Sequence, residues 1–356
     1  MKAIVLAAGQ GTRLYPVTHT MPKPLVPVAN KRLLQYALDN IKNAGITDIG
    51  IVVSPGSPIE GVYGDGSDLG VNLTYIVQEE QLGLAHAAGI CRDFIGDDDF
   101  AMFLGDNIFQ DNMANFIKDF QNSDAEASIA LAEVPDPSRF GIAVIEDGVI
   151  KNTIEKPANP PSNLAIVGIY LFRKSVFEAI DTLKPSARGE YEITDAIQKL
   201  ITDGKDVKPY TIQGWFIDAG KPKPIIQANQ LVLEEMPWTP APTDPAIVQG
   251  ESEVGHRVII GDNSKIIDSV VRGPVVIGDN VTIRNSFVGP YTAIGDNSTI
   301  EDSGVEASII MGGVTIKGVP GRIEQSVIAN DAQIISTGEA PHIYRFVLAE
   351  KSIVEV

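Results

Sequence analysis

A repeat in the last third of the chain limits its fold more than any other feature. Short apolar runs that lead into Gly-Asp-Asn begin at Val258, Val275 and Thr292, with equal spacing along the chain. A second, looser series consists of a serine followed by two apolar residues, at Ser269, Ser286, Ser308 and Ser326. Short strands and turns at a fixed period predict a β-solenoid, in which each coil buries its apolar side only against its neighbours.

The segment over 1–235 differs from the repeat, because strand-like and helix-like stretches alternate there. Apolar runs at 4–6 and 100–104 are typical of strands that are covered on both faces. The stretches 33–44 and 194–202 have helical spacing, and we expect Thr194 to cap the second helix. The alternation predicts an α/β domain with a mostly parallel sheet, whose ligands lie beyond the carboxyl ends of its strands.

The predicted domain boundaries follow these changes in pattern. The α/β domain covers 1–235, and four prolines in 236–246 indicate a stiff linker. The solenoid covers 247–335, and the tail over 336–356 has no repeat.

Charge and composition exclude several classes of protein. The net charge is −18, with 46 acidic against 28 basic residues, so we expect no nucleic-acid partner. The single Cys91 excludes an internal disulfide and a cysteine-based zinc site. No apolar stretch reaches the length of a membrane span, and the chain starts with a strand-like segment rather than a leader. We therefore expect a cytoplasmic protein that does not bind membranes.

A glycine-rich turn follows the first strand. Gly9 and Gly11 permit a close approach of the backbone to a ligand, and Arg13 adds a permanent cation, so the turn could hold a triphosphate. It matches neither the dinucleotide fingerprint, because position 14 is leucine, nor the P-loop, because Gly-Lys-Ser/Thr is missing. An ordinary strand–helix turn without a ligand is the alternative.

Three further residues could act on phosphates. Lys23 stands between two prolines, which stiffen the segment that carries its ammonium group. Asp106 and Asp218 each follow an apolar strand, and two carboxylates at neighbouring strand ends suit Mg²⁺. The alternatives are a solvated lysine and an aspartate that caps a helix.

The remaining candidates could recognise a base and a sugar. The amide of Gln78, near Gly83, offers a donor and an acceptor to a pyrimidine. Glu155 and Lys156 combine an acceptor for sugar hydroxyls with a cation for a sugar phosphate, and Arg188 adds another cation. The alternatives are a surface loop at Gln78 and an ion-paired strand end at Glu155.

Taken in order, these motifs resemble those of the sugar-1-phosphate nucleotidylyltransferases. The likeness is greatest to the long thymidylyltransferases that act on glucose 1-phosphate and carry a C-terminal hexapeptide-repeat domain. The matching segments are 6–14, 22–24, 78–87, 105–107, 140–141, 155–157, 167–172, 188–195 and 215–221. The resemblance implies a Rossmann-like mixed sheet followed by a left-handed parallel β-helix, and a homo-oligomer.

The resemblance also implies a reaction and a set of residue roles. A nucleotidyl group passes from dTTP or UTP to glucose 1-phosphate by a Mg²⁺-dependent, in-line attack on the α-phosphate, which yields dTDP-glucose or UDP-glucose and pyrophosphate. The implied catalytic residues are Arg13, Lys23, Asp106 and Asp218, the last two as Mg²⁺ ligands. The implied nucleotide-binding residues are Leu6, Ala8, Gly9, Gly11, Thr12, Arg13, Gln78, Gly83 and Asp106. The implied sugar-phosphate residues are Gly141, Glu155, Lys156, Val167, Gly168 and Arg188.

Two departures from the thymidylyltransferase pattern concern the choice of base. Pro24 and Ala219 stand where thymidylyltransferases often have glutamine and threonine, and proline at the first position also occurs in uridylyl- and guanylyltransferases. An enzyme specific for UTP or GTP with another sugar 1-phosphate is thus one alternative. A bifunctional acyltransferase is another, although the solenoid half holds only His256 and His342. A non-catalytic regulatory homologue is the third.

Overall fold

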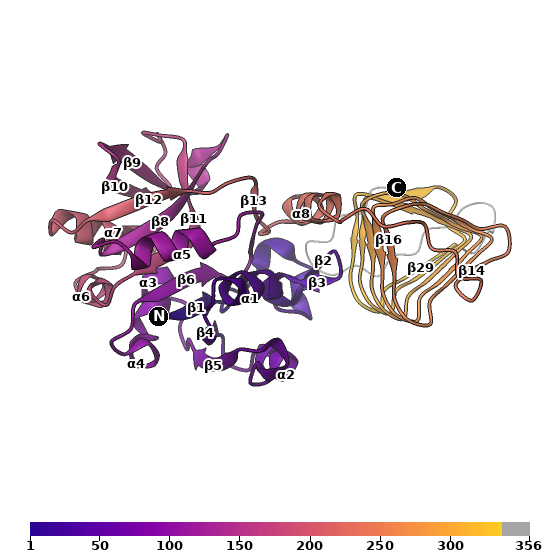
Figure 1. The fold of residues 1–356 in the computed structure, drawn as a ribbon, viewed down its shortest axis with the longest axis horizontal. Coiled ribbons are helices and arrows are strands. Elements are labelled where there is room, and N and C mark those ends of the chain that lie inside the picture. Colours follow the sequence, from indigo (N-terminus) through magenta and orange to yellow (C-terminus); the bar gives the residue numbers. More distant parts are fainter. Residues whose placement is uncertain (337–356) are drawn as a thin grey trace. The chain divides into compact units, whose positions relative to one another are not determined.

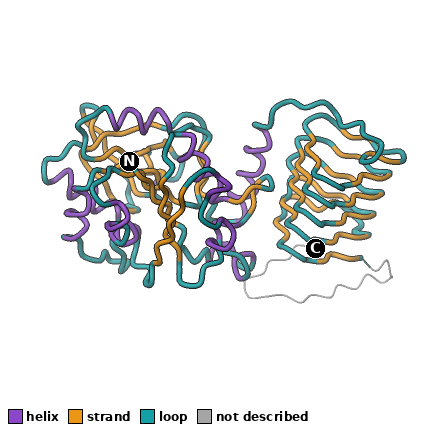
Figure 2. Tube along the Cα trace, turned by 60° about the horizontal axis from the view of Figure 1, so that its bottom comes forward, coloured by secondary structure: helices purple, strands orange, loops and turns teal. Residues whose placement is uncertain are grey.

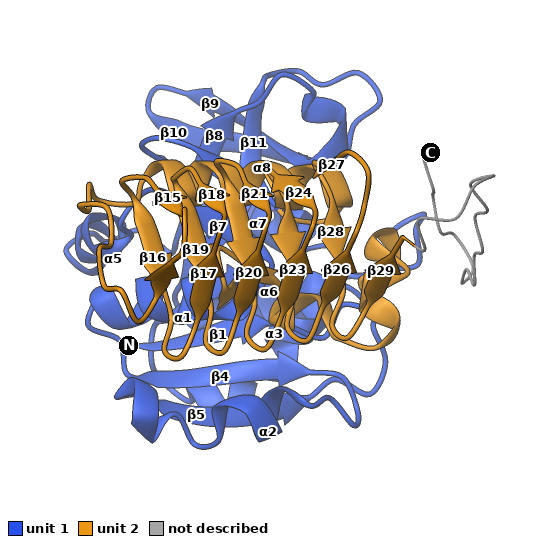
Figure 3. Cartoon of the chain, turned by 90° about the vertical axis from the view of Figure 1, so that its right-hand side faces the viewer, with its two compact units in different colours: residues 1–10, 33–218 blue, residues 11–32, 219–356 orange. Residues whose placement is uncertain are grey.

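The computed structural model describes residues 1–336 of the 356-residue chain. Contacts divide the chain into two compact units, coloured separately in Figure 3. The first unit contains Met1–Gln10 and Leu33–Asp218, and the second contains Gly11–Arg32 and everything from Ala219 onward. The predicted tail lies outside the described residues except for Ser336, and the predicted domain boundaries stay predictions.

A nine-stranded mixed sheet forms the centre of the first unit (Figure 1). Its main order is β10-β9-β11-β6-β1-β4-β5, and β8 pairs with β11 and β12. β6, β1, β4 and β5 run parallel, whereas β11 runs antiparallel to its neighbours. The strands are β1 (Lys2–Leu6), β4 (Asp48–Val53), β5 (Asn72–Val77), β6 (Phe100–Leu104), β8 (Ala127–Glu133), β9 (Gly141–Glu146), β10 (Val149–Glu155), β11 (Leu164–Phe172) and β12 (Val207–Thr211).

Apolar side chains explain these elements. The runs in β1 and β6 are buried except for the half-buried Leu6 and Leu104 at their ends, as predicted for strands that are covered on both faces. In α1 the buried residues recur at helical spacing, because one face of the helix packs on the core. The helices of the unit are α1 (Leu33–Asn43), α2 (Ile59–Tyr63), α3 (Leu84–Gly89), α4 (Arg92–Ile95), α5 (Ala114–Gln121), α6 (Ser175–Asp181) and α7 (Ile193–Thr202). No described helix is long and apolar enough to cross a membrane.

The second unit holds a short hairpin, one helix and the solenoid. The hairpin is β2 (Pro27–Val28) with β3 (Lys31–Arg32), and α8 covers Pro222–Glu234. Figure 2 shows the stacked coils that follow. One sheet contains β14 (Val248–Gln249), β17 (Lys265–Ile267), β20 (Thr282–Arg284), β23 (Thr299–Glu301), β26 (Thr315–Lys317) and β29 (Gln333–Ile335). The second contains β15 (Glu253–Val254), β18 (Val270–Val271), β21 (Phe287–Val288), β24 (Gly304–Glu306) and β27 (Arg322–Glu324). The third contains β16 (Val258–Ile260), β19 (Val275–Ile277), β22 (Thr292–Ile294), β25 (Ile309–Ile310) and β28 (Val327–Ile328).

All strand pairs described in the solenoid are parallel, and the first repeat series pairs Val258 with Val275 and Val275 with Thr292. Three short strands per coil confirm the predicted fold class, a mixed α/β sheet followed by a β-helix, and are consistent with the left-handed form. The Gly-Asp-Asn turns form stacked corners, because the Asp279 and Asp296 carboxylates accept hydrogen bonds from the amides of Asp262 and Asp279. The asparagine of each turn has a positive φ, which asparagine tolerates well.

The second repeat series divides between two sheets of the solenoid. Ser269 and Ser286 precede strands of the second sheet, but Ser308 and Ser326 precede β25 and β28 of the third. The true third member of the first pair is Ser303, whose amide donates a hydrogen bond to the Ser286 hydroxyl. The coils after β22 no longer keep a constant length, so sequence spacing alone could not assign each strand to its sheet.

Candidate active site

The glycine-rich turn leaves the carboxyl edge of the parallel sheet. Leu6 and Leu104 are register partners at the ends of β1 and β6, so the turn and the segment with Asp106 start side by side. The amide of Gly105 donates to the Leu6 carbonyl at 3.0 Å. Ala8 is buried, whereas Gly9 is exposed and has open space where a Cβ would stand.

The residues after Gln10 belong to the second unit. Gly11 has a φ of 64°, in the left-handed region that favours glycine, and its carbonyl accepts a hydrogen bond from the Thr18 hydroxyl at 2.8 Å. Thr12 and Arg13 are exposed in a 3-10 turn. Lys23 is only 6% exposed, and its Cβ lies 3.1 Å from the position of a Cβ on Gly11. The alternative of a solvated surface lysine is therefore wrong.

Asp218 ends one strand of a small two-stranded sheet, and Asp106 directly precedes the other strand. The strands β7 (Asn107–Phe109) and β13 (Phe216–Asp218) are antiparallel, and Asp218 is the register partner of Asn107, directly after Asp106. A strand rather than a helix follows Asp106, which excludes the alternative of a helix cap. This pairing agrees with the expectation of two carboxylates at neighbouring strand ends, although no local signal predicts that these two segments pair.

Asp106 and Asp218 are residues that could hold Mg²⁺. The described residues hold no group of three or more histidine, cysteine or acidic side chains arranged around one metal position. Mg²⁺ does not require such a group, because it commonly takes one or two protein carboxylates and completes its octahedral shell with water and phosphate oxygens. Oxygen donors on adjacent strand ends supply that chemistry.

Gln78 lies at the end of β5 and is 4% exposed, so the alternative of a surface loop is wrong. Its Nε2 lies 3.0 Å from Nδ1 of His86 on α3, a partner that the sequence analysis missed. Gly83 has a φ of 108°, and a Cβ there would stand 2.5 Å from the Tyr191 carbonyl oxygen. Only glycine therefore fits where the segment around Tyr191 crosses the start of α3.

Three of the predicted sugar-phosphate residues, Gly141, Lys156 and Arg188, gather around a fourth, Glu155. Gly141 begins β9 and is the register partner of Glu155 at the end of β10. Oε1 of Glu155 forms ion pairs with Lys156 Nζ at 2.8 Å and Arg188 Nη1 at 2.9 Å. The Thr194 hydroxyl donates to Oε2 of Glu155 at 3.2 Å. Both predicted cations thus meet at one carboxylate, and the alternative of an ion-paired strand end also describes this geometry.

Thr194 has a different place from the one expected. The helix α7 begins at Ile193, and its N-cap is Glu192, whose side chain forms no cap hydrogen bond. Thr194 is buried inside the first turn, and its methyl group lies 2.7 Å from the position of a Cβ on Gly141. The predicted cap is therefore wrong, because Thr194 uses its hydroxyl for Glu155 instead.

Further acids surround Arg188. Its Nη2 contacts Glu190 Oε2 at 2.7 Å, and its Nε lies 3.7 Å from Glu192 Oε1. Burial raises the pKa of the Glu192 carboxyl, against the opposing effect of the Ser186 hydroxyl that donates to it. Burial also raises the pKa of Asp195, and the charge of Glu155 adds to that shift. Burial thus disfavours the ionised form of two of the acids in this region.

Asn107 links the segment that carries Asp106 to Val167 and Gly168, the two remaining predicted sugar-phosphate residues. Its Nδ2 donates to the Val167 carbonyl at 3.0 Å, where the pairing of β11 with β8 is irregular. Gly168 follows with a φ of 84°, and a Cβ there would lie 2.8 Å from Asn107 Nδ2. The irregularity in β11 thus places Val167 and Gly168 beside the segment that carries Asp106.

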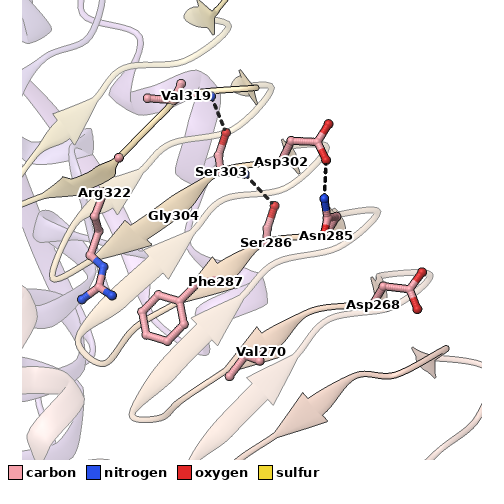
Figure 4. Close-up of a pocket in the computed structure, with 11 residues that line it drawn as sticks. Asp268, Val270, Asn285, Ser286, Phe287, Asp302, Ser303, Gly304, Val319 and Arg322 are labelled. Atoms are coloured by element: carbon pink, nitrogen blue, oxygen red, sulfur yellow. Dashed lines mark hydrogen bonds between the residues drawn. The ribbon is translucent and has the colours of Figure 1, made fainter.

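The solenoid has its own open groove of about 620 Å³ (Figure 4). Phe287 lies in it with the Arg322 guanidinium 4.4 Å from its ring centre, and the Asn285 amide donates to Asp302 at its edge. Its lining contains no histidine among the described residues. His256 packs against the Trp238 ring, and His342 lies outside the described residues. The groove therefore offers nothing specific to the acyltransferase alternative.

Comparison with known proteins identifies the class. The family model described as nucleotidyl transferase matches residues 2–235. The chain belongs to the nucleotidyl transferase family, as the order of its motifs predicted, and is an enzyme of that class.

Individual relatives show which members of the family the chain is similar to. A glucose-1-phosphate thymidylyltransferase of Streptomyces griseus is 44% identical over 100% of this chain and 99% of its own length. A low-salt glycan biosynthesis nucleotidyltransferase of Haloferax volcanii is 51% identical over 71% of this chain and 72% of its own length. Among solved structures, the chain is similar to a putative glucose-1-phosphate thymidylyltransferase from Bacillus anthracis, crystallised in complex with a sucrose. The sequence identity is 40% and the TM-score is 0.62, and the match covers 65% of this chain and 94% of that one.

Proposed function

We propose that this enzyme transfers a thymidylyl group from dTTP to glucose 1-phosphate and releases pyrophosphate. The full-length similarity to a glucose-1-phosphate thymidylyltransferase supports the substrates. The observation that carries the chemistry is the pairing of Asp218 with Asn107, which sets Asp218 beside Asp106 at the edge where the glycine-rich turn begins.

The reaction is an in-line displacement at phosphorus. An oxygen of the sugar phosphate forms a new bond to the α-phosphorus of the nucleotide, while the bond to the leaving pyrophosphate breaks. The attacking oxygen is already anionic, so the protein needs no nucleophile of its own, and catalysis depends on positioning and on neutralising charge.

Each residue then has a role in that displacement. The amides of the turn at Gly9 and Gly11 would cradle the triphosphate, and Arg13 and Lys23 would offset charge that accumulates on the phosphates. Asp106 and Asp218 would hold Mg²⁺, which when bound supplies positive charge to the phosphate oxygens. Glu155 would accept hydrogen bonds from sugar hydroxyls, while Lys156 and Arg188 would hold the sugar phosphate.

Base selection would depend on Gln78. Its buried amide can pair with thymine or uracil, which present the same Watson–Crick edge of one N–H between two carbonyls. The bases differ only by the 5-methyl group, and a methyl contact contributes about 1 kcal/mol. A mismatched hydrogen-bonding edge costs more than a missing methyl group, so purines should be rejected more strongly than uracil.

The test is a grid of kcat/KM for pyrophosphate release, with four nucleoside triphosphates against several sugar 1-phosphates. We expect dTTP with glucose 1-phosphate to be best, UTP to follow within roughly a hundredfold, and ATP and GTP to be far worse. GTP or ATP at the top of the grid would overturn the base assignment but leave the reaction class. Absence of pyrophosphate release from every pair would overturn the function itself. Homo-oligomeric assembly and a cytoplasmic location stay predictions.

A further inference from the structure

The phosphate-binding segment is built into the same unit as the solenoid. Residues 11–32, which contain Gly11, Arg13 and Lys23, group with α8 and the coils rather than with the sheet from which they emerge (Figure 3). The segment ends in the β2–β3 hairpin, whose two tip residues, Ala29 and Asn30, have φ values of 48° and 60°.

A single buried amide joins this hairpin to the solenoid. Asn229 on α8 is fully buried, and its Oδ1 accepts a hydrogen bond from the backbone amide of Ala29 at 2.8 Å. Its Nδ2 donates to the Tyr291 carbonyl at the start of β22, also at 2.8 Å. Asn30 adds a direct link, because its Nδ2 donates to the Ile294 carbonyl at 2.6 Å. Two separate connections thus fasten the hairpin tip to one coil.

The helix that carries Asn229 is itself fixed to the coils. The Tyr291 hydroxyl donates to Glu234 Oε2 at 2.8 Å near the end of α8. The Arg257 guanidinium donates to the Leu233 carbonyl at 3.0 Å, where a cation also favours the helix terminus. Because Arg257 holds the last backbone carbonyls of α8, the Asn229 side chain keeps a defined position relative to the solenoid even without the exposed contact between Tyr291 and Glu234.

The hairpin tip is closely coupled to Lys23. The Val26 amide donates to the Lys23 carbonyl at 3.0 Å, and Val26 and Val28 are fully buried. Pro24 and Pro27 restrict the backbone between them. Lys23 in turn packs against Gly11. A displacement of the tip should therefore move the Lys23 ammonium group and the turn at Gly11 together.

We propose that Asn229 is a positioning residue for the phosphate-binding segment, and that the solenoid is the fixed support from which Lys23 is held in place. The proposal rests on the proposed function only in assigning Lys23 to the phosphates. The site requires an amide, since one oxygen and one N–H face a backbone donor and a backbone acceptor that would otherwise lose these partners. An aspartate of the same shape supplies no N–H and introduces a buried charge.

The test uses full-length Asn229→Ala and Asn229→Asp, with Tyr291→Phe as the matched control. The control removes the hydroxyl bond to Glu234 but keeps the carbonyl that Asn229 uses. We expect kcat to fall roughly tenfold to a hundredfold in the Asn229 variants, because small misplacements of charge cost that much. The KM for glucose 1-phosphate should stay within about twofold, since its predicted residues lie in the first unit. The control should keep kcat.

A second variant keeps the proposal testable if the Asn229 variants do not fold. Asn30→Gly removes the bond to Ile294 and suits the positive φ, so it should fold and should lower kcat in the same direction by a smaller factor. Hydrogen exchange gives a readout that does not depend on catalysis. Amides in 22–32 should exchange faster in the Asn229 and Asn30 variants, while β1 and β6 stay protected.

The outcomes separate the two proposals. Faster exchange of 22–32 in a protein that releases no pyrophosphate would overturn the function but retain the anchoring. Unchanged exchange and unchanged kcat in Asn30→Gly and in either Asn229 variant would overturn the anchoring. The anchoring would also be overturned if Tyr291→Phe lost as much kcat as the Asn229 variants and had the same melting temperature as they do. General destabilisation would then explain the effect.

Discussion

Asp106 and Asp218 lie one register position apart because β7 and β13 pair, and Asp106 is the most direct single-residue test of the metal assignment. Asp106→Asn keeps the shape of the side chain and removes its charge. We expect it to fold normally and to lose kcat by about two or more orders of magnitude, because the ion it would hold offsets charge that develops during transfer. Steady-state pyrophosphate release over a Mg²⁺ titration measures the effect.

Asp111 provides a matched control in the same segment. Its Oδ2 accepts hydrogen bonds from the Tyr210 hydroxyl at 3.1 Å and the Gln213 amide at 2.8 Å, so its role is structural. An amide oxygen can still accept, and Asp111→Asn should retain near-normal kcat. Near-normal turnover of Asp106→Asn at saturating Mg²⁺ would contradict the metal assignment.

The structural setting of some candidate residues could be predicted because their signal is local. Lys23 has flanking prolines, and Asp106 directly follows an apolar strand, so each shows its setting within a short stretch of sequence. Asn229 gives no such signal, since its partner Ala29 lies in a distant part of the chain. His86 and Thr194 were missed or misplaced for the same reason: their hydrogen bonds to Gln78 and Glu155 depend on how the chain crosses itself.

At the scale of elements, the irregular part of β11 should be sensitive to added volume. Gly168→Ala places a Cβ 2.6 Å from Leu104 Cδ1 and 2.8 Å from Asn107 Nδ2, at a φ of 84°. The left-handed conformation costs an alanine about 1–2 kcal/mol, and overpacking adds roughly 1–3 kcal/mol. We expect a lower free energy of unfolding and reduced kcat, because Asn107 adjoins Asp106. Urea unfolding and pyrophosphate release measure the two effects.

Gly148→Ala isolates the effect of the backbone. Gly148 lies in the hairpin between β9 and β10 with a φ of 77°, and no atom lies within 4 Å of its added Cβ. It should show the conformational cost alone and keep kcat. Equal destabilisation of the two variants, with kcat unchanged in both, would show that β11 can absorb the extra methyl group.

The solenoid shows how far an element can be predicted from a repeat. The series at Val258 and Val275 predicted one sheet correctly, because these coils keep a constant length. After β22 the coil that leads from Ala293 to its partner Ile309 is slightly shorter, and the coil from Ile309 to Val327 is slightly longer. Turns absorb the difference while the strands stay in register, and sequence spacing alone cannot show which turn changed.

For the whole molecule, the division into units could not be predicted from sequence composition. The sequence pattern does change near residue 235, and the proline-containing segment 236–246 forms no helix or strand. Yet residues 11–32 group with the unit that holds the solenoid, although they are continuous with the first strand of the sheet. A boundary drawn along the chain cannot represent a segment that leaves one unit and returns to it.

The net charge of −18 affects the folded state as a whole. Like charges repel one another more in the compact state than in an expanded chain, and salt screens this repulsion over a Debye length of about 10 Å at 0.1 M. We therefore expect the melting temperature to rise by several degrees between about 20 mM and 500 mM KCl, and most steeply below about 0.1 M. Circular dichroism at pH 7.5 measures it. The matched control is the same titration at pH 5, where part of the carboxylates are protonated and the gain should shrink. A melting temperature that is flat or falls with KCl at pH 7.5 would show that specific ion pairs, such as Arg188 with Glu155, outweigh the repulsion of the excess acids.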